Sequence, residues 1–167
     1  MLIVEFEKAN PPPRVEAKNG SIEWYSREDG DGLLAVTNER TIDAPSGKTH
    51  AVTPLFTRGE YGAAAGPHLF YLALRVPEDY RNEFLAWYES EHLPMLLEAK
   101  GWDGCRFVEE PVNDGLLFHA LHQLRDLSAL ESAERKRSRA TPWFGRLAKN
   151  AWFDSGFVRS IYRRITP

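Results

Sequence analysis

Hydrophobic and polar residues alternate most regularly at residues 68–76, which predicts a β-strand with two different faces. One face carries Phe70, Leu72, Leu74 and Val76, and the other carries Leu69, Tyr71, Ala73 and Arg75. From residue 77 the apolar spacing changes to three and four, which predicts a helix to about His92. Pro94 should kink or break this helix, and Gly101 should end the turn that follows.

The rest of the second half completes a ferredoxin-like order. Residues 105–110 and 116–124 are predicted strands joined by the turn residues Asn113, Asp114 and Gly115. Ser128 and Glu131 have the spacing of a capping box, which predicts a helix from there to about Ala140. A further helix should begin at Thr141–Pro142, and residues 157–165 should form the last strand. The predicted order is therefore β-α-β-β-α-β.

The first half repeats this order with shorter connections. Strands are predicted at residues 1–7, 21–27, 33–39 and 50–58, with a turn at 29–32. The segments 8–20 and 40–49 are too short and too rich in Pro, Gly and Asn for full helices. We predict an α+β chain of two tandem ferredoxin-like units within one compact globular unit. Residues 1–62 form a degenerate half with eroded helices, and residues 67–167 form a complete half. A chance resemblance between two hairpins is the alternative.

Composition limits the protein to a few classes. The chain has 167 residues, 43% of them hydrophobic, and a net charge of -3, which suits one folded domain. No apolar run is long enough to cross a membrane, and the N-terminal stretch lacks the pattern of a signal peptide. Cys105 is alone, so an internal disulfide is excluded. We expect a cytoplasmic protein.

Charge is distributed unevenly along the chain. Residues 125–167 contain 10 Lys or Arg and 4 Asp or Glu, whereas residues 1–124 contain 11 and 20. A basic segment of this kind either forms a solvated helix face around residues 135–139 or binds nucleic acid. No nucleic-acid-binding motif accompanies it, so we expect no nucleic-acid partner.

His92 is the strongest candidate for chemistry. Phe84, Tyr88 and His92 are four residues apart and share one stripe of the predicted helix, so His92 should face the sheet. A semi-buried imidazole can act as a general acid or base near neutral pH. The alternative is a helix-end histidine that only binds backbone carbonyls or the sheet.

Polar residues on the sheet face away from the helices suggest a ligand pocket. Such a pocket would suit a small aromatic or alicyclic anion, and its predicted lining comprises Tyr71, Arg75, Arg106, His119 and Gln123. The alternative is that this face packs against the other half or another subunit. His119 and His122 are three apart on a strand and point to opposite faces, so we predict no metal site. No nucleotide or flavin motif is present, and we predict no cofactor.

Several motifs resemble the dimeric α+β barrel superfamily. They are the helix motif Glu83–Pro94 with Gly101–Trp102 and Arg106–Phe107 after it, then Thr141–Pro142–Trp143 and Ile161–Arg164. The resemblance is closest to EthD-like proteins and related uncharacterised bacterial proteins, and it covers about residues 68–165. Members of this superfamily join two ferredoxin-like sheets into a barrel with a cavity, within a chain or across a dimer.

The resemblance implies a range of activities. The superfamily includes cofactor-free monooxygenases, isomerases, polyketide cyclases and haem-dependent peroxidases, and several members use a cavity histidine as acid or base. His92 matches the Glu-His-x-Pro motif. No second motif supports a haem ligand.

Two hypotheses follow from the sequence. In the first, a cofactor-independent enzyme acts on a small cyclic or aromatic acid. His92 transfers a proton, Tyr71 and His119 assist, and the ligand is held by Arg75, Arg106, Gln123 and Tyr88. In the second, a non-catalytic protein binds a small ligand or serves in assembly. In both cases we expect a homodimer with a small organic molecule as partner.

Overall fold

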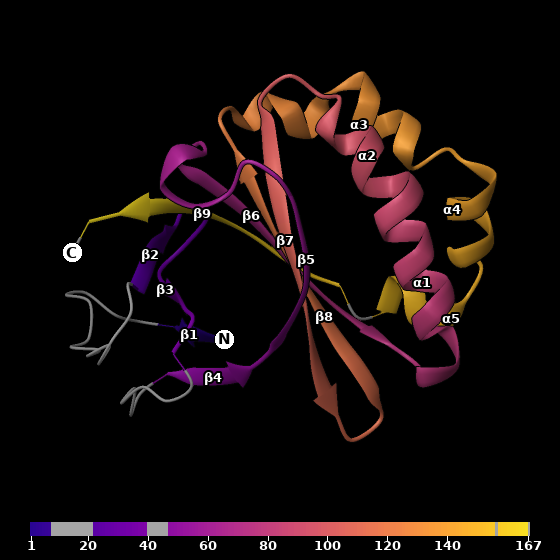
Figure 1. The fold of residues 1–167 in the computed structure, drawn as a ribbon, viewed down its shortest axis with the longest axis horizontal. Helices are drawn as coiled ribbons and strands as arrows, with labels where there is room; N and C mark the ends of the chain where they lie inside the picture. Colours follow the sequence, from indigo (N-terminus) through magenta and orange to yellow (C-terminus); the bar gives the residue numbers. More distant parts are fainter. Residues whose placement is uncertain (8–21, 40–46, 156, 167) are drawn as a thin grey trace.

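A computed structural model describes residues 1–7, 22–39, 47–155 and 157–166 (Figure 1). The strands are β1 (Leu2–Phe6), β2 (Ile22–Arg27), β3 (Leu33–Thr37), β4 (Lys48–Ala51), β5 (Thr53–Gly59), β6 (His68–Val76), β7 (Trp102–Val112), β8 (Gly115–Leu124) and β9 (Val158–Ile165). The helices are α1 (Arg81–Trp87), α2 (Leu93–Leu97), α3 (Ala133–Ser138), α4 (Pro142–Leu147) and α5 (Ala151–Ser155). A π-helical turn, Tyr88–His92, joins α1 to α2, and 3-10 turns lie at Gly62–Ala64, Glu78–Tyr80 and Leu127–Glu131.

The strands of the described residues form one antiparallel sheet in the order β4-β1-β3-β2-β9-β6-β8-β7-β5. Within the second half the order β9-β6-β8-β7 is fourth, first, third, second, as in a ferredoxin-like unit. Within the first half β4-β1-β3-β2 has the same order. The predicted α+β fold of tandem ferredoxin-like units is therefore confirmed, while the boundary between residues 62 and 67 stays a prediction.

Two strands cross from one half to the other. β9 pairs with β6 through Val158–Arg163, and its last residues, Tyr162–Ile165, pair with β2 of the first half. In the other direction β5 leaves the first half and pairs with β7. The halves thus share backbone hydrogen bonds at two places, and Figure 1 shows the sheet curving round between them.

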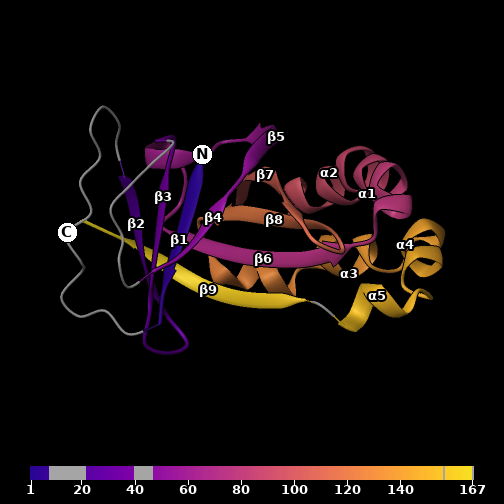
Figure 2. The same ribbon diagram turned by 90° about the horizontal axis from the view of Figure 1, so that it is seen from below.

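One face of the sheet is apolar and lies under the helices. The other face curves inward, so that residues of the two halves pack against each other. Phe84 and Trp87 from α1 pack on Phe107 and Phe118 of the sheet. On the other face Leu69, Tyr71 and Leu121 pack on residues of the first half, among them Ile3 and Leu34. Figure 2 shows the helices gathered over the second half, with β1 to β4 at the far end of the molecule. The predicted alternation along β6 is confirmed.

Pro94 does not end the helix: the predicted disturbance takes the form of a π turn, and the predicted further turn is α2. The N–H of Leu93 bonds to the carbonyl of Tyr88, five residues earlier, and the chain continues as α2. Proline lacks an N–H, and its ring crowds the carbonyl four residues before it. The wider π turn accommodates this disturbance without ending the helix.

Two other local predictions need correction. Ser128 does not cap an α-helix: Asp126 accepts from its N–H at the start of a 3-10 turn, and Ser132 caps α3. The predicted strand 50–58 is two strands, β4 and β5, separated at Val52. The prediction that the first half has lost its helices concerns segments 8–20 and 40–49. These segments lie outside the described residues, apart from residues 47–49. Thr141 does cap the next helix, as predicted, by accepting from the N–H of Phe144.

None of the helices in the described part of the chain is long and apolar enough to span a membrane.

Gly104 tests the junction between the halves. A Cβ added at Gly104 would lie 2.1 Å from the carbonyl oxygen of Glu60, so the backbone would have to move. We expect Gly104→Ala to lower the free energy of unfolding by about 1–3 kcal/mol in urea denaturation. Gly145→Ala is the matched control because a Cβ there meets nothing within 4 Å inside α4. It should raise stability by about 0.5–1 kcal/mol. Equal stability of the two variants would contradict the described junction.

Candidate active site between the helices and the sheet

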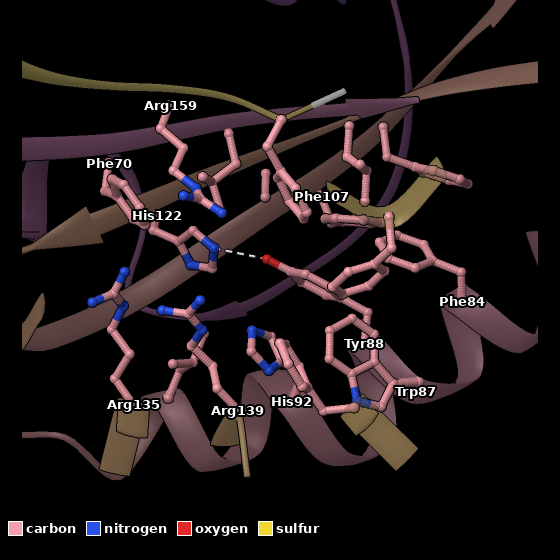
Figure 3. A pocket seen from close by; sticks show the side chains of 18 of the residues that line it. Phe70, Phe84, Trp87, Tyr88, His92, Phe107, His122, Arg135, Arg139 and Arg159 are labelled. Carbon is pink, nitrogen blue, oxygen red and sulfur yellow. Dashed lines mark hydrogen bonds between the residues drawn. The ribbon is translucent and has the colours of Figure 1, made fainter. Parts of the chain in front are cut away.

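A cavity of about 80 Å³ lies between the helix layer and the sheet (Figure 3). Its walls are mostly aromatic, with Phe84, Trp87, Tyr88, Phe107 and Phe118 among the lining residues. At roughly 10–15 Å³ of accessible volume per water, this space holds several waters, which corresponds to one or two small rings. Ring-lined walls favour a planar ligand.

His92 enters this cavity from the π turn. Its ring lies against Trp87, with the ring centroids 4.5 Å apart. Nδ1 is 3.4 Å from the backbone oxygen of Ser138. A carbonyl oxygen can only accept, so Nδ1 carries the proton and Nε2 has a free lone pair.

Burial keeps the imidazole of His92 neutral. It lowers the pKa of His92 to about 4, and the nearby guanidinium groups of Arg139 and Arg135 act in the same direction. A neutral imidazole with an unprotonated Nε2 can act as a general base at physiological pH.

His122 is a second buried imidazole on the same cavity, and its tautomer is set by its partners. The indole N–H of Trp102 donates to Nδ1 at 3.1 Å, so Nε2 must carry the proton. Nε2 then donates to the hydroxyl oxygen of Tyr88, 2.7 Å away. Burial lowers the pKa of His122 to about 3, so the ring is neutral. The Tyr88 hydroxyl keeps its own proton, which it donates to the Cys105 thiol.

Three arginines line the side of the cavity opposite the aromatic wall. Figure 3 shows Arg135, Arg139 and Arg159 beside His92 and His122. In the described ranges none of the three forms an ion pair with a carboxylate. Guanidinium groups beside an aromatic slot attract planar anions through hydrogen bonds and stacking.

The sheet separates the predicted catalytic residues into two groups. Tyr71 and His119 form a hydrogen bond at 2.8 Å, but they lie on the face opposite to the helices. Their predicted meeting with His92 in one site is therefore wrong. The cause is the period of two along a strand: the face of β6 that carries Tyr71 points away from the helix layer that carries His92.

The predicted ligand-binding residues are also divided. Tyr88 lines the cavity of His92, whereas Arg75 lines a separate cavity with Tyr71. Arg106 lies over the ring of Tyr61, 4.1 Å from its centroid. The side chain of Gln123 donates to Tyr25 and accepts from Arg164, inside the sheet's closed face.

Sequence reasoning missed His122, Trp102 and the three arginines. His122 lies between Ala120 and Leu124 on the face of β8 that points to the helices, and this alternation was the available signal. The basic run 135–139 was interpreted as a solvated face. Arg137 fits that interpretation, but Arg135 and Arg139, four residues apart, turn toward the cavity.

Comparisons with known proteins support the fold. No protein-family model and no curated protein sequence matches the chain. Among solved structures, an anthrone oxidase-like protein aligns over 99% of this chain and 90% of its own, with 11% identity and a TM-score of 0.67.

Two proteins from Listeria are similar in the same way. A ferredoxin fold protein of Listeria monocytogenes, related to antibiotic biosynthesis monooxygenases, aligns over 99% of this chain and 95% of its own, with 13% identity and a TM-score of 0.60. A monooxygenase-like protein of Listeria innocua aligns over 99% and 94%, with 13% identity and a TM-score of 0.56. At these identities the likeness shows a shared ferredoxin-like fold.

The two cavity histidines should resist protonation. With their pKa lowered to about 4 and about 3, the NMR signals of His92 and His122 should hardly move between pH 8 and pH 5.5. In the chain unfolded by urea both should titrate near pH 6.5. Between about pH 4 and about pH 6.5 the unfolded chain binds more protons than the folded chain. These two groups therefore lower the free energy of unfolding as the pH falls below about 6.5. A folded-state midpoint near 6.5 for His92 would contradict its burial.

Proposed function

We propose that the protein is a cofactor-independent enzyme that removes a proton from a small cyclic or aromatic acid in the cavity of His92. The observation that supports this proposal is the tautomer of His92: its Nδ1–H is directed at the Ser138 carbonyl, so the unprotonated Nε2 is available as the base. The three possible reactions, namely isomerisation, cyclisation or monooxygenation, share this first step.

Removal of the proton leaves an anion that the other cavity residues can stabilise. Arg135, Arg139 and Arg159 supply positive charge beside His92. Charge that develops on the substrate is stabilised by such preorganised donors in a water-poor site. The aromatic walls hold the ring system in place.

The names of two structural neighbours are consistent with this proposal. One structural neighbour is called anthrone oxidase-like and another monooxygenase-like. Both names point to oxidation of an organic substrate, and O₂ can react directly with a sufficiently delocalised carbanion. The EthD-like resemblance of the helix motif belongs to the same proposal, and so does the homodimer expected from the sequence.

Exchange of hydrogen for deuterium tests the base directly. We expect the protein to speed deuterium uptake from D₂O into the acidic CH₂ group of 2-tetralone, a two-ring ketone, under anaerobic conditions. His92→Ala should slow the catalysed exchange by roughly 10²–10⁴-fold because it removes the general base. Mass spectrometry measures the uptake. His68→Gln is the control, since His68 lies outside this cavity, 3.2 Å from Glu28.

The outcome of that assay separates the two functional hypotheses. Equal exchange by the wild type and His92→Ala would remove His92 from the mechanism. If the wild type binds a ring compound without any exchange, the non-catalytic ligand-binding alternative is favoured. Anthrone, with three rings, serves as a larger substrate in the same assay, and admission of O₂ then reveals oxidation to anthraquinone and water.

Anion binding depends on the cavity arginines. We expect Arg139→Gln to weaken binding of 1-hydroxy-2-naphthoate roughly tenfold, as for the loss of one charge-assisted hydrogen bond. Quenching of tryptophan fluorescence measures the affinity, because Trp87 and Trp102 line the cavity. Arg137→Gln is the matched control, since Arg137 pairs with Glu98 at the surface. Equal weakening by both variants would indicate a general charge effect and contradict the assigned anion site.

A further inference from the structure

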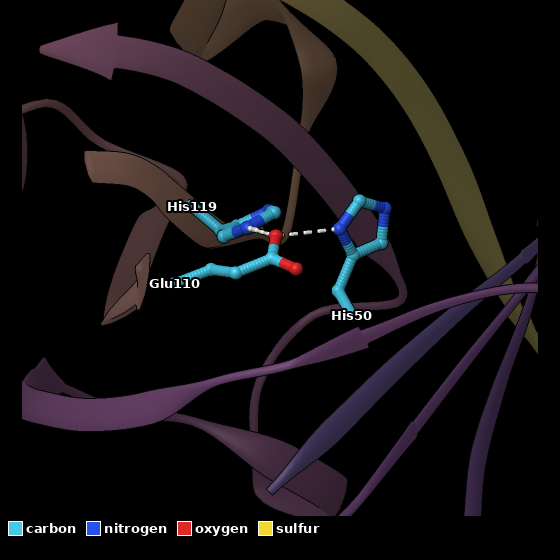
Figure 4. A group of neighbouring side chains, drawn as sticks. All are labelled: His50, Glu110 and His119. Carbon is cyan, nitrogen blue, oxygen red and sulfur yellow. Dashed lines mark hydrogen bonds and ion pairs between the residues drawn. The ribbon is translucent and has the colours of Figure 1, made fainter. Parts of the chain in front are cut away.

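We propose that His50, Glu110 and His119 bind a divalent transition-metal ion inside the closed face of the sheet. One ligand atom from each of the three residues lies within 4.8 Å of the other two. Figure 4 shows the two imidazoles on either side of the Glu110 carboxylate. This group lies across the sheet from His92, so the proposal is independent of the proposed proton transfer.

Both halves of the chain contribute to the group. His50 comes from β4, Glu110 from β7 and His119 from β8. His50 is 4% exposed and His119 is not exposed at all. Polar side chains buried this deeply need partners, and metal ligation is one way to satisfy them.

Each histidine has an acceptor for the ring nitrogen that would not bind the metal. Nδ1 of His119 is 2.8 Å from the hydroxyl oxygen of Tyr71. Nε2 of His50 is 3.3 Å from a carboxylate oxygen of Glu5 but makes no aligned hydrogen bond. Histidines that bind metals usually direct the second nitrogen at a carboxylate or another oxygen, which sets the tautomer and orients the ring.

A count of hydrogens identifies the contact that a metal ion can complete. Tyr71 lies 3.1 Å from Glu5 and 2.8 Å from His119, and His119 Nε2 lies 3.3 Å from Glu110 Oε2. These three contacts need three hydrogens, but a neutral Tyr71 and a neutral His119 supply only two.

A metal ion between Nε2 and the carboxylate satisfies the remaining contact. Zinc bonds of about 2.0–2.1 Å in a tetrahedral site place ligand atoms roughly 3.3 Å apart. Glu110 Oε2 is already 3.3 Å from His119 Nε2 and 2.7 Å from His50 Nδ1. Two imidazoles and one carboxylate suit Zn²⁺, Co²⁺ or Fe²⁺ better than Mg²⁺ or Ca²⁺.

An entry path reaches the group. A cavity of about 410 Å³ is bordered by His50 and Tyr71, with Lys48 and Arg75 also in its lining. Three protein ligands leave at least one position for water or another small ligand.

Titration with Co²⁺ tests the site, because bound cobalt gives visible d–d bands that report its geometry. The untagged full-length protein is first stripped with a chelator. We expect the wild type to bind one equivalent, and Glu110→Gln to lose at least roughly 100-fold in affinity as a direct ligand is removed. Tyr71→Phe should weaken binding by about 10–100-fold while leaving all three ligands in place.

Two variants serve as controls for this titration. Glu109→Gln changes the neighbouring carboxylate, which pairs with Arg81, and should bind Co²⁺ like the wild type. His92→Ala should also leave cobalt binding unchanged, which separates this test from that of the proposed function.

Thermal unfolding provides a second readout. Zn²⁺ should raise the melting temperature of the wild type, since it binds the folded state at the junction of both halves. It should raise that of Tyr71→Phe less. If Glu110→Gln does not fold, Tyr71→Phe decides the question. The absence of saturable Co²⁺ binding by the wild type, or equal affinity of wild type and Tyr71→Phe, would overturn the proposal in favour of a hydrogen-bonded network.

Discussion

Backbone hydrogen bonds across β9 and β5 are the constraint on which the rest of this structure depends. β9 pairs with β6 of the second half and with β2 of the first half, while β5 of the first half pairs with β7 of the second. These pairings join the two sets of strands into a single sheet. Without the pairing of β9 with β2, the inner face of β6 and β8 would lose the residues of the first half that cover it. The burial of Tyr71 and His119 follows from this closure.

Because side chains alternate along a strand, the same sheet supplies two chemically different environments. The face under the helices is walled by aromatic rings and carries His122 at its centre. The opposite face carries a connected polar group that begins at Glu5 and ends at Glu110. His119 and His122 therefore lie on opposite faces of β8, although only two residues separate them.

Sequence reasoning predicted the features that depend on local periodicity. The strand at His68–Val76, its two faces, the Thr141 cap and the order of the elements all follow from spacing or capping chemistry. It also placed Tyr71 and His119 on one face of the sheet, where they share a hydrogen bond, but it did not predict that His50 and Glu110 meet. His50 and Glu110 are 60 residues apart and come together only because β4 and β7 lie at opposite ends of one curved sheet. The direction of Arg135 and Arg139 likewise depends on where α3 packs, which no local pattern encodes.

The π turn at Tyr88–His92 gives the helix one residue more than a regular α-helix would hold in the same length. Winding these same residues as a regular α-helix would rotate everything that follows the turn by about 100° relative to α1. Phe84 and Trp87 before the turn could then not stay in the core together with Leu93 and Leu96 after it. The π turn therefore acts as a one-residue insertion. It sets the orientation of the His92 imidazole independently of α1, the helix that anchors it.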